Sequence, residues 1–90
     1  MRIFYRPAFA RSFKGLSAAE QQDVRAAQAQ LSKAFGRPHL HAGLGIRRFG
    51  NYFEFRAGLK LRVLFVIESG DAVLVTVGNH DDVRRYIKEN

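Results

Sequence analysis

The sequence has 90 residues, with 15 Lys and Arg against 8 Asp and Glu, and it contains no cysteine. This length predicts a single domain over residues 1–90, and the lack of cysteine excludes disulfide frameworks, Cys-ligated zinc and thiol nucleophiles. The longest apolar run, residues 63–67, is too short to cross a bilayer. No apolar stretch lies among the N-terminal cations, as a secretory signal would require. We therefore expect a cytoplasmic protein with no membrane partner.

The positive charge is concentrated in the middle of the chain. Residues 37–66 carry a net charge of +5, whereas residues 67–90 carry −2. Eleven of the 15 cations are Arg, whose planar guanidinium pairs bidentately with phosphate and stacks on bases. The charge therefore predicts a polyanionic partner, most simply a nucleic acid. The alternative is a basic, solvated surface with no specific partner.

The first half of the chain predicts a short strand followed by two helices. Residues 2–5 are rich in aromatic and branched side chains, as strands prefer. Proline is tolerated at the first position of a helix, a Ser-x-x-Glu capping box opens a helix, and glycine with a following proline ends one. These signals place the helices at residues 7–14 and 18–35. The signals are Pro7, Gly15, the Ser17–Glu20 box, the apolar stripe from Val24 to Phe35, Gly36 and Pro38.

The second half predicts four strands and a last short helix. Short turns rich in Gly, Asn and Ser separate the strands, and short links imply antiparallel neighbours. The strand over residues 61–67 is almost continuously apolar, so we expect it to be central and covered on both faces. Asn79 or His80 caps the helix that follows. The predicted strands are residues 44–49, 52–56, 61–67 and 72–77.

The order β-α-α-β-β-β-β-α predicts an α+β fold. We expect an antiparallel sheet with the two N-terminal helices packed on one face and a short C-terminal helix. The other face of the sheet is expected to stay partly open.

Side-chain alternation along two of the strands predicts a polar cluster on this open face. Successive side chains on a strand point to opposite faces. Glu54 and Arg56 therefore share one face of their strand, and Lys60 and Arg62 share one face of the next. Together they would form a solvent-exposed cluster with three cations to one anion. The alternative is an ordinary solvated face in which Glu54 pairs with Arg62.

The three histidines, His39, His41 and His80, lie outside the predicted strand and helix interiors and are placed to converge at one edge of the sheet. RNA cleavage by its own 2′-hydroxyl needs a base, an acid and cations on the phosphate oxygens. Two histidines, which titrate near neutral pH, supply the first two groups, and Arg56 and Arg62 supply the cations. The alternative is that the histidines are loop residues and a helix cap. Their spacing does not indicate zinc, and we expect no metal or cofactor.

Aromatic residues flank several of the basic ones. Phe49, Tyr52 and Tyr86 are candidates to stack on splayed bases, although most aromatic residues in a chain of this composition belong to the core. The predicted RNA-binding residues are Arg47, Arg48, Lys60, Arg84, Arg85 and Tyr86.

Four segments of the chain together resemble the RelE/ParE toxin superfamily of bacterial toxin–antitoxin systems. The order and spacing of the segments carry the resemblance, which spans nearly the whole chain. The segments are residues 39–44 (HLHAGL), 52–58 (YFEFRAG), 61–65 (LRVLF) and 77–83 (VGNHDDV). The resemblance implies a small basic toxin that is silenced by an antitoxin encoded beside it. RelE-like members cleave mRNA in the ribosomal A site, whereas ParE-like members poison DNA gyrase.

The resemblance also implies roles for single residues. Arg62 matches a phosphate-binding arginine of the ribonuclease branch, and Arg56 matches the arginine before the hairpin glycine. His80 matches a catalytic histidine near the C-terminus, and one of the two loop histidines matches a further histidine of those members. The sequence departs from the pattern at Arg84, where such members have an aromatic residue, in a hairpin one residue longer, and in a longer C-terminal helix.

We therefore expect a ribosome-dependent mRNA endonuclease toxin. Its expected partners are mRNA, the ribosome and a cognate antitoxin that covers the basic face with a helix or an added strand. The predicted catalytic residues are His80, Arg62, Arg56 and His41. The alternatives are a ParE-type gyrase inhibitor, which needs no acid–base pair, and an RNA-binding module that does not cleave its ligand.

Overall fold

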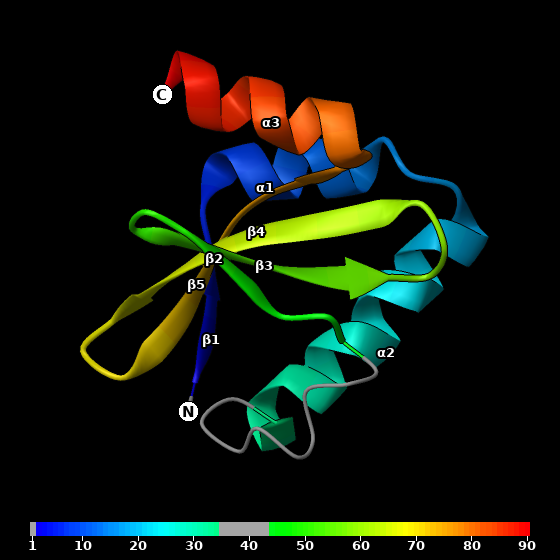
Figure 1. Ribbon diagram of the computed structural model, residues 1–90. Helices are drawn as coiled ribbons and strands as arrows, with labels where there is room; N and C mark the ends of the chain where they lie inside the picture. The colour runs from blue at the N-terminus through cyan, green and yellow to red at the C-terminus, as the bar shows by residue number, and fades with distance from the viewer. Residues whose placement is uncertain (1, 35–43) are drawn as a thin grey trace.

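The computed structural model describes residues 2–34 and 44–90, which form three helices and one five-stranded sheet (Figure 1). The elements follow one another in the order that the sequence predicts. Within these residues no helix is both long enough and apolar enough to cross a membrane. The elements are β1 (Ile3–Tyr5), α1 (Pro7–Lys14), α2 (Ala18–Ala34), β2 (Arg47–Phe49), β3 (Tyr52–Ala57), β4 (Leu61–Glu68), β5 (Asp71–Gly78) and α3 (His80–Glu89).

The two N-terminal helices begin where the sequence signals place them. Pro7 is the first residue of α1. Before α2, the Glu20 N–H donates to Ser17 Oγ (3.1 Å) and the Ser17 N–H donates to Glu20 Oε1 (2.9 Å), which completes the predicted capping box. The predicted end of this helix at Phe35 and Gly36 lies outside the described residues.

The sheet has the strand order β1-β5-β4-β3-β2. Strands β2 to β5 are antiparallel, as their tight links predict. Strand β1 instead runs parallel to β5 and pairs Ile3 with Ala72 and Tyr5 with Leu74. The sheet is therefore mixed, and the prediction of a purely antiparallel sheet is wrong for this strand. The antiparallel rule holds for strands joined by short turns, whereas α1 and α2 separate β1 from the next strand.

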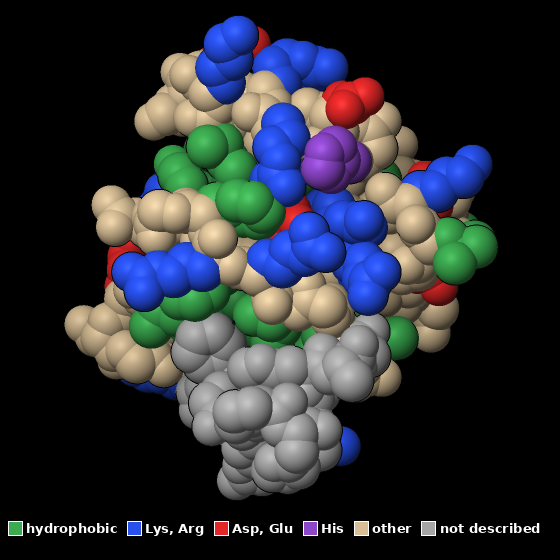
Figure 2. All heavy atoms as spheres, in the orientation of Figure 1, with side chains coloured by type: hydrophobic (Ala, Val, Ile, Leu, Met, Phe, Trp, Pro, Cys, Tyr) green, Lys and Arg blue, Asp and Glu red, His purple; other side chains and the backbone are tan. Residues whose placement is uncertain are grey.

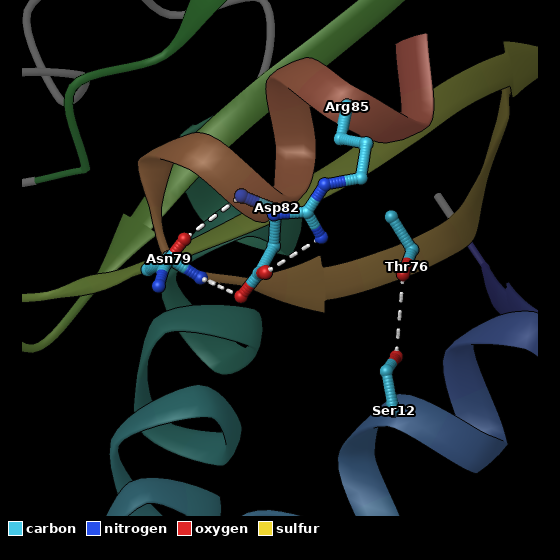
Figure 3. A network of polar contacts seen from close by, with 5 residues as sticks. All are labelled: Ser12, Thr76, Asn79, Asp82 and Arg85. Atoms are coloured by element: carbon cyan, nitrogen blue, oxygen red, sulfur yellow. Dashed lines mark hydrogen bonds and ion pairs between the residues drawn. The ribbon is translucent and has the colours of Figure 1, made fainter. Parts of the chain in front are cut away.

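A hydrogen bond of Ser12 fixes α1 beside β5. Strand β1 pairs only with residues 72–74 of β5, and beyond that point the Val77 N–H donates to Ser12 Oγ (3.1 Å). The same hydroxyl group lies 3.0 Å from the Ala8 carbonyl oxygen and 3.4 Å from Thr76 Oγ1 (Figure 3). Ser12 thus replaces a strand partner for β5 where the edge strand has ended.

Each face of the sheet carries its own hydrophobic core. On one face, Phe9 of α1 and Leu31 of α2 pack with Phe65 and other strand residues. On the second face, Val83 of α3 packs with Leu64 in a smaller cluster. Figure 1 shows α2 and α3 on opposite sides of β3 and β4. Strand β4 is central, as predicted, and α3 covers only part of the second face. Side chains of β3 and β4 that alternate with the polar ones lie in or against the larger core: Phe53, Phe55, Leu61, Val63 and Phe65.

Strand β2 is shorter than predicted and begins at Arg47 instead of Leu44. The Leu44 carbonyl still accepts a hydrogen bond from the Arg56 N–H (2.7 Å). Gly45, however, has a φ of +59°, a backbone conformation that glycine adopts without the steric cost of a side chain. The chain bends there, so regular pairing with β3 starts only at Arg47.

The start of α3 is held by reciprocal hydrogen bonds between Asn79 and Asp82. The Asp82 N–H donates to Asn79 Oδ1 (2.8 Å), and the Asn79 N–H donates to Asp82 Oδ2 (3.0 Å) (Figure 3). A Cβ at Gly78 would lie 2.6 Å from the Asp82 Cβ, so a glycine here lets the helix begin directly at the end of β5. Of the two predicted caps, Asn79 is the N-cap, and His80 becomes the first residue of the helix.

Asp71 holds β1 at the edge of the sheet. Its Oδ1 accepts a hydrogen bond from the Arg2 backbone N–H (3.0 Å), and its Oδ2 lies 3.4 Å from Arg2 Nη2. The backbone hydrogen bond, assisted by the attraction of the Arg2 guanidinium, lowers the pKa of Asp71 below its usual value of 3.8.

This lowered pKa predicts a pH-dependent contribution to stability. A carboxyl group whose pKa is lower in the folded state stabilises that state above its unfolded pKa, and this stability is lost as the pH falls through the folded pKa. We expect the wild type to be more stable than Asp71→Asn at neutral pH, and the difference to shrink progressively below pH 3.8. Urea unfolding at several pH values measures it. A difference that stays constant with pH would contradict the assignment.

Candidate nucleic-acid interface

The register of the sheet brings two arginines to the first turn of α3. Arg56 of β3 lies directly opposite Arg62 of β4, and Arg62 lies opposite Gly78 of β5. His80 follows two residues after Gly78 and is exposed. Directly opposite residues share a face of the sheet, and here it is the second face, on which α3 packs. The predicted neighbourhood of Arg56, Arg62 and His80 is therefore present in the fold.

Glu54 of β3 is the buried charged side chain of this region, with 3% of its surface exposed. Its Oε1 lies 4.0 Å from Arg62 Nε, and its Oε2 lies 3.9 Å from Arg84 Nη1. Arg47 of β2 is its direct cross-strand neighbour. The prediction that Glu54 is exposed is wrong, because Arg84 reaches over it from α3. Of the alternative interpretation, the ion pair between Glu54 and Arg62 is present, whereas the solvated face is not, because Glu54 is buried.

Arg84 is held between this carboxylate and an aromatic ring. Its guanidinium carbon lies 3.9 Å from the centre of the Phe49 ring of β2, which is a close cation–π contact. Arg84 and His80 are four residues apart on α3 and therefore share one side of the helix. Through these contacts Arg84 links the sheet to the side of α3 on which His80 lies.

Arg56 lies against the backbone of Gly45. A Cβ built at position 45 would lie 2.5 Å from Arg56 Nε and 3.0 Å from Arg56 Nη2, so the guanidinium occupies the space of the missing side chain. Arg56 is exposed, and it forms no ion pair with the described residues. Its charge remains available to an anion from solution.

We call Arg47, Arg56, Arg62, Arg84 and His80, arranged around Glu54, the basic face. Figure 2 shows a histidine beside several Lys and Arg side chains on this side of the molecule, with a small acidic area between the cations. Four guanidinium groups surround one carboxylate, so the positive charge is only partly neutralised. Guanidinium groups bind phosphate oxygens, and an exposed histidine can donate or accept a proton. The arrangement therefore suits binding of, and proton transfer at, a phosphodiester.

Several residues predicted to belong to this site lie elsewhere. Lys60 is exposed in the turn between β3 and β4, outside the strand, and lines a cleft with Asn79 and Asp82. Arg48 is adjacent to Arg47 on β2 and therefore points to the opposite face. Its guanidinium carbon lies 5.7 Å from the centre of the Phe53 ring.

Two predicted RNA-binding residues of α3 have partners within the helix or the core. Arg85 Nη1 lies 3.3 Å from Asp82 Oδ1 (Figure 3). Tyr86 is half-buried and packs edge-on against Tyr52, with ring centres 6.4 Å apart. Both predicted loop histidines, including the candidate catalytic residue His41, lie outside the described residues. Among the described residues, no three His, Asp or Glu side chains are close enough to hold a metal ion together.

The sequence interpretation missed two contributors to the basic face. Gly45 interrupts a predicted strand, and a glycine in such a place often marks close approach of another group, so a local signal existed. The sequence predicts Phe49 as a candidate to stack on a base, whereas in the structure its ring contacts the Arg84 guanidinium. Its arginine partner comes from α3, and no local pattern connects the two.

Solved structures match the fold closely, although no protein-family model and no curated protein matches the sequence. A chain of the RelB–RelE antitoxin–toxin complex from Methanococcus jannaschii has a TM-score of 0.70 at 13% identity, covering 92% of this chain and 96% of that one. A mutant of YafQ from Escherichia coli has a TM-score of 0.72 at 10% identity, with coverage of 92% and 98%. A chain of the toxin–antitoxin complex RelBE2 from Mycobacterium tuberculosis has a TM-score of 0.64 at 19% identity, with coverage of 88% and 96%.

The chain has the fold of the RelE toxins. The resemblance predicted from the sequence is thereby confirmed for the fold. Within this RelE fold, the basic face lies where β3, β4 and the first turns of α3 meet.

The contact between Gly45 and Arg56 is testable with a matched pair of variants. Gly45→Ala should lower stability by about 1 kcal/mol, because alanine is strained at positive φ, and should also displace the Arg56 guanidinium. Gly50→Ala is the control, since Gly50 has a φ of +60° but a Cβ at this position would meet nothing within 4 Å. Urea unfolding measures stability, and the Arg56 Nε–H resonance reports the displacement. An unmoved Arg56 resonance in Gly45→Ala would contradict the assignment.

Proposed function

We propose that this protein is the toxin of a type II toxin–antitoxin system and that it cleaves mRNA on the ribosome. The observation that carries the proposal is the basic face, where guanidinium groups that are unpaired or only partly paired within the described part of the chain lie beside an exposed histidine. The RelE fold supports the assignment, because that fold is found in toxins crystallised with their antitoxins.

The proposed reaction uses the 2′-hydroxyl of the RNA itself as nucleophile. A base removes the 2′ proton, the 2′ oxygen bonds to phosphorus, the bond from phosphorus to the 5′ oxygen breaks, and an acid protonates that oxygen. Arg56 and Arg62 bind the non-bridging oxygens and stabilise the added negative charge. His80 transfers one of the protons, and His41 remains the candidate for the other.

Other cations extend the RNA-binding surface around this centre. We propose that Arg47 and Arg84 contact flanking phosphates next to Arg62. We also propose that Lys60 and Arg85, near the start of α3, and Arg48, on the opposite face of β2, contact ribosomal RNA. Such contacts add salt-dependent affinity and carry no base specificity.

The proposed partner that silences the toxin is an acidic antitoxin protein. A product of the neighbouring reading frame that neutralises the growth defect on co-expression would support this partner. The net charge of +7 favours association with an acidic chain.

Single substitutions in the basic face test the catalytic roles. Arg62→Ala should lower cleavage of translated mRNA about 10²–10³-fold, the usual effect of losing one transition-state donor. His80→Ala should lower it about 10²–10⁴-fold through loss of proton transfer. Arg11→Ala removes an exposed cation of α1 away from the basic face and is the control with wild-type activity. Primer extension on mRNA from induced cells measures cleavage, and wild-type cleavage by both site variants would remove the assignment.

The same experiment separates the alternatives. A gyrase inhibitor needs no proton transfer, so His80→Ala would stay toxic and induce DNA-damage signalling without mRNA cleavage. A non-catalytic RNA-binding module would bind RNA in a salt-dependent way and leave translated mRNA intact.

A further inference from the structure

We propose that Glu54 is a positioning residue that assembles the basic face before RNA binds. This inference rests on the proposed function, because it assigns a role to a carboxylate within the RNA-binding site. Glu54 does not touch the substrate in this proposal. It acts through Arg62 and Arg84, whose guanidinium groups it holds beside each other.

The geometry places Glu54 between two elements that have no other charged link among the described residues. Arg62 belongs to β4 and Arg84 to α3, and each lies on a different oxygen of the same carboxylate, at 4.0 Å and 3.9 Å. Glu54 Oε2 and Arg84 Nη1 are both buried and have no hydrogen-bond partner in the described part of the chain. Because these two atoms are buried, water screens their attraction less than it would at the surface, even without a direct hydrogen bond.

The burial of a carboxylate at this position is hard to explain by stability alone. Removing a carboxylate from water is costly, and an apolar residue of similar size often replaces a buried ion pair without loss of stability. An apolar side chain is accommodated directly beside this position, since Leu64 of β4 lies opposite Glu54 and is fully buried. An acidic residue is therefore better explained by its effect on the nearby arginines.

That effect is to make an unfavourable group of cations stable in the free protein. Arg56 and Arg62 lie directly opposite each other, and like charges in that relation repel. Glu54 offsets part of this repulsion and keeps Arg84 over the sheet. Glu54 contacts only one nitrogen of each arginine, at distances longer than a hydrogen bond. The guanidinium N–H groups that do not face Glu54 can still bind phosphate. Substrate then meets cations that are already in place, which reduces the entropy lost on binding.

The test compares Glu54→Gln with Glu68→Gln. Glu68 forms an ion pair with Arg6 (2.9 Å) away from the basic face, so both variants lose one carboxylate from an arginine pair and gain the same net charge. Simple charge counting predicts that both bind RNA more tightly. The positioning role predicts that Glu54→Gln binds about tenfold more weakly, comparable to the loss of one charge-assisted phosphate contact, whereas Glu68→Gln binds as well as the wild type or better.

Two measurements carry the comparison. The first is the Nε–H resonances and side-chain dynamics of Arg62 and Arg84 by NMR in the free protein. The second is the dissociation constant for a single-stranded RNA oligonucleotide made uncleavable by 2′-deoxy substitution. Glu54→Leu is the second variant: it keeps the side-chain volume, so it separates loss of charge from loss of packing if the Gln variant is poorly folded. Urea unfolding shows which variants are folded.

Disordered Arg62 and Arg84 side chains together with weaker RNA binding in a folded Glu54 variant would support the proposal. Unchanged arginine resonances, or tighter RNA binding in line with the added charge, would overturn it. The NMR measurement needs no RNA cleavage. Loss of arginine order in Glu54→Gln would therefore support the positioning role even if the wild type cleaves no mRNA. The absence of cleavage would then reject only the proposed function.

Discussion

The packing of α3 against the second face of the sheet is the contact on which the candidate site depends. A small core of Val83, Leu64 and Val75 packs the helix against the sheet, and the reciprocal hydrogen bonds of Asn79 and Asp82 fix its start at the end of β5. Without this helix the second face would be an ordinary solvated surface with a few cations. With it, His80 and the arginine four residues later are brought to the strands that carry the other guanidinium groups.

The basic face gathers like charges that repel one another around one carboxylate. Arg56 and Arg62 repel each other across neighbouring strands, and Arg84 is brought close to them by α3. A single buried carboxylate, Glu54, lies between Arg62 and Arg84, and the ring of Phe49 stacks on the Arg84 guanidinium. These contacts only partly neutralise the cations, so the surface remains attractive to a polyanion.

Most of the fold was predictable because its signals are local. The capping box before α2 depends on Ser17 and Glu20 alone, and the alternation of β3 and β4 sorts each side chain to one face without reference to distant residues. The predictions of strand direction and strand length were wrong where they depend on elements far away in the sequence. Strand β1 runs parallel to β5 because two helices carry the chain across the sheet before the next strand. Strand β2 starts late because Gly45 bends the chain beside the Arg56 guanidinium.

The sequence by itself determined the elements, their order, the two-faced pattern of the strands and the excess of arginine, since each follows from residue type and spacing along the chain. Only the tertiary structure decided that Glu54 is buried, that Arg47 lies directly opposite Glu54, and that Arg84 stacks on Phe49. Alternation shows which side chains share a face of a strand. Whether that face meets water or another element depends on where a helix from the far end of the chain comes to rest.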